Sequence, residues 1–179
     1  MCDEALVRRL REGDRRAFEE VFERHADGVF ALLRRLSGCA ATADDLLQDT
    51  FLKLAAASSD LAPGTRLGPY VFAIARNTWV SYRRAMRFDL AALVEDLVSA
   101  APEPECNVAW GELSARTETA LGALPAELRE TLALSLSPLE PADVARAMGL
   151  SEEAYRKRLS RARAALRDAL GACYTEVLP

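Results

Sequence analysis

Basic side chains are concentrated in two short segments of an otherwise acidic chain. Four arginines and no acidic residue lie between Arg76 and Phe88, and six basic residues and no acidic residue lie between Arg156 and Arg167. The net charge of −4 and the pI near 5.2 therefore conceal two separate basic patches. Such patches suit contacts with phosphate, although two solvated helix surfaces would have the same composition.

The second basic segment lies on a predicted helix that ends a helix-turn-helix pattern. A short helix from Pro141 and a turn at Gly149 precede it, and Ser151 is expected to cap it. Its apolar positions, which would pack on the domain, are Tyr155, Leu159, Ala162, Leu166 and Leu170. The other side carries Lys157, Ser160, Arg161 and Ala164, with Arg156, Arg163 and Arg167 along one flank. A cationic helix of this kind can enter the DNA major groove. An arginine-rich helix that is merely soluble is the alternative.

The first basic segment carries aromatic rings at helical spacing. Phe72, Arg76, Trp79 and Arg83 recur at i, i+4, i+7 and i+11. Aromatic rings stack on bases and guanidinium groups bind phosphates, so this row suits unstacked single-stranded DNA. Alternatively, the aromatic residues only widen the buried face of the helix.

A third group of polar residues lies upstream, where Asp45, Gln48 and Asp49 fall within one helical turn and Lys53 follows one turn later. Paired carboxylates can act as acid and base, but the sequence supplies no nucleophile, glycine-rich phosphate loop or metal-ligand cluster. We therefore expect an interaction face, with no enzymatic activity, metal or cofactor. The four dispersed cysteines and the single histidine do not have the spacing of a metal site.

These residues require an all-α fold of two small domains joined by a linker. The first domain, residues 1–88, is expected to contain a turn over Ala5–Leu10 and a helix from the N-cap Asp14 to Ser37-Gly38. The core face of that helix is predicted to include Phe18, Val21, Phe22, Val29, Leu32, Leu33 and Leu36. A helix capped by Thr42, a loop over 58–69 and a helix from Tyr70 would follow.

The second domain is expected to span residues 113–174, after a linker over 89–112. The linker contains Pro102 and Pro104, which end any helix. In the second domain, Pro125 opens a helix that runs to about Leu136, followed by the helix-turn-helix. The chain has neither an apolar leader at its start nor the roughly 20 apolar residues of a membrane span, so we expect a cytoplasmic location.

In this order, the motifs resemble those of extracytoplasmic-function (ECF) RNA polymerase sigma factors. ADDLLQDTFLKL resembles the family's polymerase-docking segment, and PYVFAIARNTWVSYRRAMR resembles the segment that melts and recognises the −10 element. LPAELRETL and ADVARAMGLSEEAYRKRLSRARAALRDAL resemble the helix-turn-helix domain that recognises the −35 element, and REGDRRAFEEVFERH matches the opening helix. The likeness covers nearly the whole chain except the linker.

The resemblance implies a role for each matching position. Core RNA polymerase would contact Asp45, Gln48, Asp49 and Lys53. The −10 DNA would contact Phe72, Arg76, Asn77, Trp79, Arg83, Arg84 and Arg87. The −35 DNA would contact Arg156, Lys157, Arg158, Ser160 and Arg161. The family also implies an anti-sigma factor as a partner.

The chain departs from the family at the start of the last helix, where Glu153-Ala154 replaces the usual Gly-Thr and Tyr155 replaces a small aliphatic residue. Two other functions are compatible with the motifs. One is a stand-alone helix-turn-helix regulator that binds duplex operators without polymerase. The other is a degenerate sigma-like interaction protein, which the altered helix start leaves open.

Overall fold

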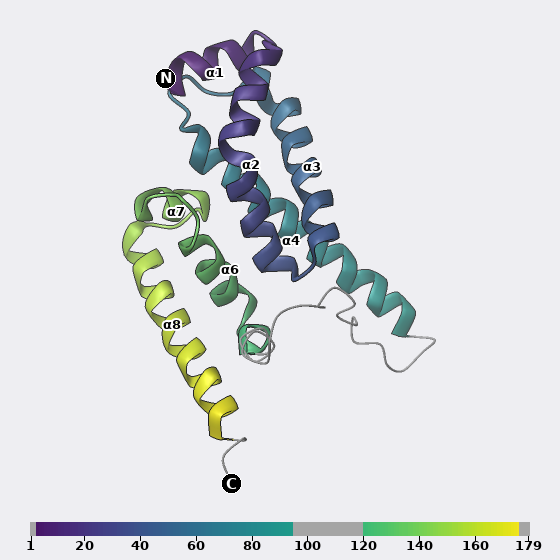
Figure 1. Ribbon diagram of the computed structural model, residues 1–179, viewed down its shortest axis with the longest axis vertical. Coiled ribbons are helices and arrows are strands. Elements are labelled where there is room, and N and C mark those ends of the chain that lie inside the picture. The colour runs from purple at the N-terminus through teal and green to yellow at the C-terminus, as the bar shows by residue number, and fades with distance from the viewer. Residues whose placement is uncertain (1–2, 95–119, 176–179) are drawn as a thin grey trace. The chain divides into compact units, whose positions relative to one another are not determined.

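The computed structural model describes residues 3–94 and 120–175, and all its regular elements within these ranges are helical. The chain divides into two compact units, one before and one after the boundary between Glu105 and Cys106. The described residues therefore confirm the all-α prediction (Figure 1).

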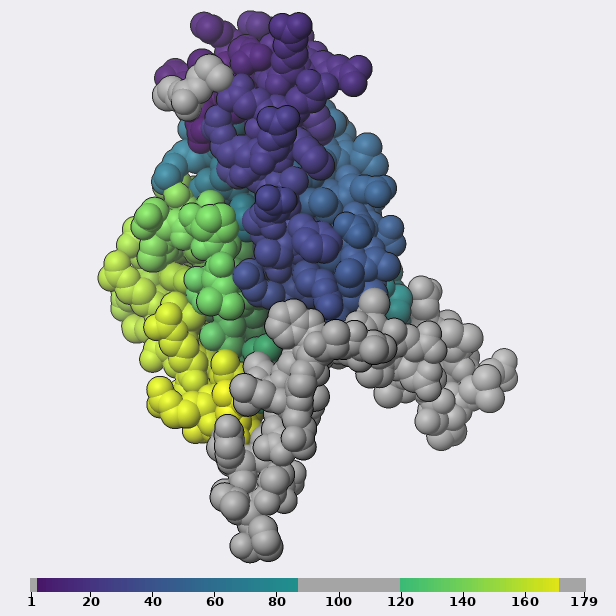
Figure 2. Space-filling model, in the orientation of Figure 1, coloured from purple at the N-terminus to yellow at the C-terminus, as the bar shows by residue number. Residues whose placement is uncertain are grey.

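Unit 1 contains α1 (Asp3–Arg11), α2 (Arg15–Ser37), α3 (Ala40–Ala57), the 3-10 turn η1 (Ser58–Asp60) and α4 (Leu67–Val94). Helices α2, α3 and α4 pack against one another in pairs, and α1 packs on α2 and η1. The fully buried side chains at their centre are Leu6, Val7, Val21, Val29, Leu32, Leu33, Leu54, Leu67, Val71 and Phe72. On the face seen in Figure 2, the side chains of α2 and α3 form a continuous outer surface.

The ends of α2 lie where the sequence places them. Asp14 Oδ1 accepts hydrogen bonds from the backbone N–H groups of Arg16 (2.9 Å) and Ala17 (3.4 Å), which are unpaired in any first turn. At the other end, Gly38 adopts a left-handed conformation with φ of 73°. That conformation strains residues with a Cβ, so a glycine there ends the helix at low cost. Phe22 differs from the prediction, since 40% of its surface is exposed, although its ring centroid lies 4.7 Å from that of Phe51.

Three predicted boundaries in unit 1 were wrong. Helix α3 begins at Ala40 with Cys39 at the N-cap position, three residues before Thr42, so Thr42 lies inside the helix and does not cap it. The Ser37 side chain bonds the backbone of Cys39 and sets this earlier turn. Helix α4 begins at Leu67, within the predicted loop, because Pro69 is tolerated in a first turn. It also continues to Val94, six residues into the segment expected to be a linker.

Unit 2 contains α6 (Ala126–Ser135), α7 (Pro141–Ala147) and α8 (Glu152–Thr175). Helix α8 packs on both α6 and α7. The predicted helix-turn-helix is confirmed, with Pro141 in the first turn of α7 and Gly149, at φ of 67°, between α7 and α8. Helix α8 extends to Thr175, beyond the predicted end near Leu170. The first residues of the predicted second domain, 113–119, lie outside the described residues.

Candidate nucleic-acid interface

The exposed side of α8 is held outward by its N-terminal cap and its buried face. Ser151 Oγ accepts a hydrogen bond from the N–H of Ala154 at 3.2 Å and fixes where the helix begins. Tyr155 and Ala162 are buried on the inner side. Burial raises the pKa of the Tyr155 phenol, so the ring is held as a neutral part of the core. The helix therefore cannot rotate its polar face inward without exposing this ring.

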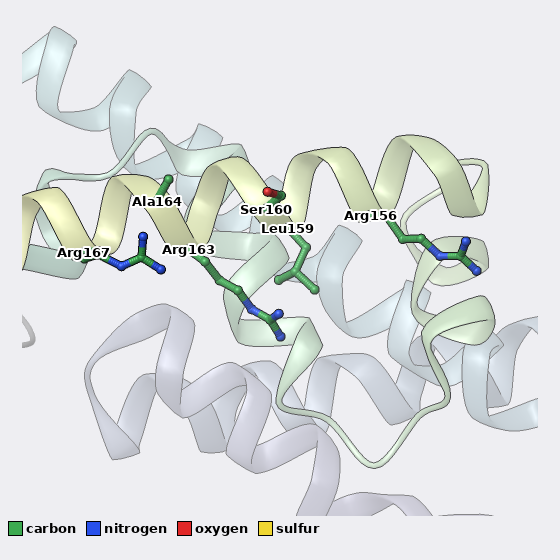
Figure 3. A pocket seen from close by; sticks show the side chains of 6 residues that line it. All are labelled: Arg156, Leu159, Ser160, Arg163, Ala164 and Arg167. Atoms are coloured by element: carbon green, nitrogen blue, oxygen red, sulfur yellow. The ribbon is translucent and has the colours of Figure 1, made fainter.

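The predicted outward row is present on α8. Lys157, Ser160, Arg161 and Ala164 are all exposed. Arg156, Arg163 and Arg167 are exposed along the flank, and in Figure 3 Arg156, Leu159 and Arg163 extend toward one side of α8 while Ser160 and Ala164 extend toward the other. A helix is about 10–12 Å across and the major groove of B-DNA is about 12 Å wide, so this side can meet base edges and phosphates together.

Ion pairs occupy the start of this basic surface. Glu152 pairs with Arg156 at 3.0 Å, and Glu153 pairs with Lys157 at 2.6 Å, each one turn apart. Arg158 differs from the other predicted DNA contacts: it is half-buried and pairs with Glu127 of α6 at 3.7 Å. Arg161, Arg163 and Arg167 make no ion pair with the residues that the structure describes. Among the described residues of α8, the arginines that form no ion pair therefore lie toward the middle of the helix.

The aromatic row predicted on α4 is not an exposed surface. Phe72 is 0% exposed, so the prediction that it contacts DNA was wrong, and the alternative that aromatic residues widen the buried face holds for it. Trp79 is also buried and stacks on the half-buried ring of Tyr82, with ring centroids 5.9 Å apart. This stacking adds to the stability of unit 1, because the Trp79 ring is buried and the Tyr82 ring is partly removed from water.

A neighbouring row of α4 is exposed instead. Asn77, Ser81 and Arg84 recur at i, i+4 and i+7, and all three are exposed. Arg76 and Arg83 are half-buried between this row and the core. The side chain of Arg87 lies outside the described residues. The basic end of α4 thus presents polar and cationic side chains, and the half-buried Tyr82 lies next to Ser81 and Arg83 in the chain.

Helix α3 presents a face of different chemistry. Asp45, Gln48 and Asp49 are exposed as predicted, and Leu52 lies one turn further along the same face. Leu52 is 68% exposed and was not identified from the sequence, although its spacing at i+7 from Asp45 and i+3 from Asp49 places it there. An exposed leucine beside two carboxylates is typical of a protein interface with an apolar centre and a charged rim.

Lys53 occupies a different position from the carboxylates. Its ammonium group donates a hydrogen bond to Thr78 Oγ1 on α4 at 3.0 Å. Thr78 is buried, so this bond satisfies a hydroxyl group inside the α3–α4 contact. Lys53 therefore links two helices of unit 1 and leaves the outward face to Asp45, Gln48, Asp49 and Leu52, hereafter the α3 outer face.

Among residues 3–94 and 120–175, no group of three or more His, Cys, Asp or Glu residues could hold a metal ion. Among the described helices, none has both the length and the apolar character needed to span a membrane. The arrangement instead defines a class of helical protein with an acidic interaction face in one unit and a helix-turn-helix with a basic helix in the other.

Known proteins identify that class. The Sigma-70 region 2 family matches residues 21–88, and the Sigma-70, region 4 family matches residues 114–166. The chain is 34% identical to the RNA polymerase sigma factor CarQ of Myxococcus xanthus, over 96% of this chain and 99% of CarQ. It is 32% identical to the ECF RNA polymerase sigma factor SigE of Mycolicibacterium smegmatis, over 86% of this chain but only 62% of SigE.

A solved structure agrees with these sequence relatives. The sigma factor RpoE, crystallised with the anti-sigma factor NepR from Bartonella quintana, is 25% identical with a TM-score of 0.68, over 86% of this chain and 96% of RpoE. The chain belongs to the ECF RNA polymerase sigma factors. Its role is that of a sigma factor in transcription initiation.

Proposed function

We propose that the two units divide promoter recognition and polymerase binding between the faces described above. Unit 1 binds core RNA polymerase through the α3 outer face, and unit 2 binds the −35 element through the outward row of α8. The observation that carries the proposal is the contrast in charge between the two faces. Carboxylates and an exposed leucine lie on the outer face of α3, whereas the exposed charged residues of α8 after its first turn are mainly lysine and arginine.

The α3 outer face suits a basic protein surface and not DNA. Asp45 and Asp49 would repel phosphates. They lie beside the exposed Leu52, whose burial against a protein partner would contribute favourably to the free energy of binding. Burying a leucine side chain contributes about 1.5–3 kcal/mol when the burial is complete. Lys53 takes part indirectly in this proposal, because it holds α3 against α4 through Thr78.

The basic end of α4 is proposed to bind the −10 element. Asn77 and Arg84 are exposed there, and Arg76 and Arg83 lie beside them. A base that leaves the stack costs a few kcal/mol, and stacking on the face of an aromatic ring together with nearby cations offsets this cost. We assign this role to the region around Trp79 and Tyr82, together with Arg87, and not to Phe72.

The mechanism proposed for the chain is binding without catalysis. It would join core polymerase in the cytoplasm, contact both promoter elements and stabilise the melted strand. An anti-sigma factor is proposed as a further partner, supported by the crystallised RpoE–NepR complex. Such a partner would have to cover the α3 outer face or the outward row of α8 to prevent initiation.

Transcription in vitro with bacterial core RNA polymerase and a library of promoters tests the proposal. We expect initiation from a defined subset of promoters only when the full-length protein is present. Specific binding to duplex DNA without polymerase, and no initiation, would instead support a stand-alone regulator. Binding to polymerase without initiation or DNA binding would support a sigma-like interaction protein.

A further inference from the structure

Glu153 lies one helical turn before Lys157, the first residue of the outward row of α8. Glu153 precedes Lys157 by four residues, Ser160 by seven and Arg161 by eight, so all four lie on one side of the helix. The side chain of Glu153 is 78% exposed. Glu152 differs, because it lies on the flank and pairs with Arg156 there.

We propose that Glu153 determines promoter specificity by accepting a hydrogen bond from the N4 amino group of a cytosine in the −35 element. This inference rests on the proposed binding of α8 in the major groove. A recognition helix contacts base edges mainly with residues near its N-terminus, and Glu153 is in the first turn of α8. In this arrangement the side of α8 that carries Glu153 and the outward row faces the base edges, whereas flank positions such as Glu152 and Arg156 face the phosphates.

The chemistry of a carboxylate selects cytosine among the four bases. An ionised carboxylate only accepts hydrogen bonds, and the major-groove edge of cytosine presents a donor. Guanine presents two acceptors there and thymine presents an acceptor and a methyl group, so both are unfavourable. Adenine offers an amino donor beside the acceptor N7, which repels a carboxylate.

Lys157 completes the recognition unit. Its ammonium group lies 2.6 Å from the Glu153 carboxylate and presents only donors. Acceptor and donor side by side match a C·G pair, in which the cytosine amino group lies beside the guanine O6 acceptor. An exposed ion pair of this kind is weak, so exchanging it for base contacts costs little.

Selection of promoters with a randomised −35 element tests this role, using the full-length protein bound to bacterial core RNA polymerase. The wild type should enrich cytosine at one position, and Glu153→Gln should reduce that preference at least about fivefold, the lower limit for a direct base contact. The variant should shift toward adenine, because a glutamine side chain pairs with adenine N6 and N7. Glu152→Gln is the matched control: it removes the same charge from the flank and should leave the selected sequence unchanged.

The possible results separate this inference from the function on which it depends. If Glu153→Gln and the wild type select the same base at every position, the inference is overturned while −35 binding stands. If Glu152→Gln changes the selected sequence as much as Glu153→Gln does, the inference is also overturned, since the loss of one negative charge near the start of α8 would then explain both results. If the wild type enriches no −35 sequence at all, the proposed function of α8 fails together with the inference.

Discussion

Asp3 caps the N-terminus of α4 from 64 residues away, since its Oδ2 atom accepts a hydrogen bond from the backbone N–H of Leu67 at 3.1 Å. The other carboxylate oxygen, Oδ1, lies 3.5 Å from a guanidinium nitrogen of Arg24 on α2. One side chain in α1 therefore connects the starts of α1 and α4 with the middle of α2. Because α4 carries the proposed −10 contacts, the geometry of this cap bears on DNA binding as well as on stability.

Asp3→Ala should lower the free energy of unfolding of unit 1 by about 1 kcal/mol, the usual effect of losing a helix N-cap. Urea denaturation followed by circular dichroism measures this change. Asp3→Asn keeps an acceptor for Leu67 and should lose less, which separates the cap from the Arg24 ion pair. Glu4→Ala is the control, because Glu4 is an exposed acidic neighbour. Equal losses in Asp3→Ala and Glu4→Ala would contradict a role for the cap.

The sequence predicts an element well where its signals are local. Asp14 and Gly38 define both ends of α2, because an acceptor side chain and a left-handed glycine act within one turn of their own positions. Thr42 has an equally favourable side chain for a cap, yet the chain reaches helical geometry earlier, through the Ser37 turn. A preference for caps cannot decide between two starts that lie three residues apart.

Burial is harder to predict, because it depends on neighbours that are distant in sequence. Phe72 and Asn77 both lie beside the core row of α4, and only the packing of α2 and α3 shows that the former is buried and the latter exposed. Leu52 is the reverse case, an apolar residue that is exposed. Its apolar side chain suggests a core position, but the helical period places it on the α3 outer face with Asp45 and Asp49.

Asp49→Arg should abolish or strongly reduce binding to core RNA polymerase, because it reverses the charge at the centre of the α3 outer face. Asp49 is exposed, so the thermal unfolding of the variant should match that of the wild type. Binding is measured by pull-down or by fluorescence anisotropy with purified core enzyme. Glu12→Arg introduces the same change of charge at an exposed residue after α1 and should bind normally. Undiminished affinity in Asp49→Arg would remove α3 from the polymerase interface.

Arg161→Ala should weaken binding of the polymerase complex to duplex DNA containing the −35 element by about five- to a hundredfold, the usual range for a contact between arginine and guanine. Binding to a single-stranded −10 oligonucleotide should not change, because Arg161 belongs to unit 2. Arg35→Ala, which removes an exposed arginine of α2, is the control for general charge. Equal weakening on both DNA probes would contradict the assignment of the −35 element to α8.

Lowering the pH should destabilise unit 1 through His25. Burial lowers the pKa of its imidazole below the usual value, the Arg24 charge lowers it further, and Asp3 opposes both effects. Because the unfolded chain takes up the proton at a higher pH than the folded chain, the free energy of unfolding falls as the pH drops below about 6.5. Its slope cannot exceed about 1.4 kcal/mol per pH unit for one proton, and the loss ends once the folded state is also protonated.

Urea denaturation between pH 7.5 and about pH 5 measures this slope, and His25→Gln, which cannot take up the proton, should give a flatter profile. Identical profiles for His25→Gln and the wild type would show that other groups, such as carboxylates, cause the acid sensitivity of the domain.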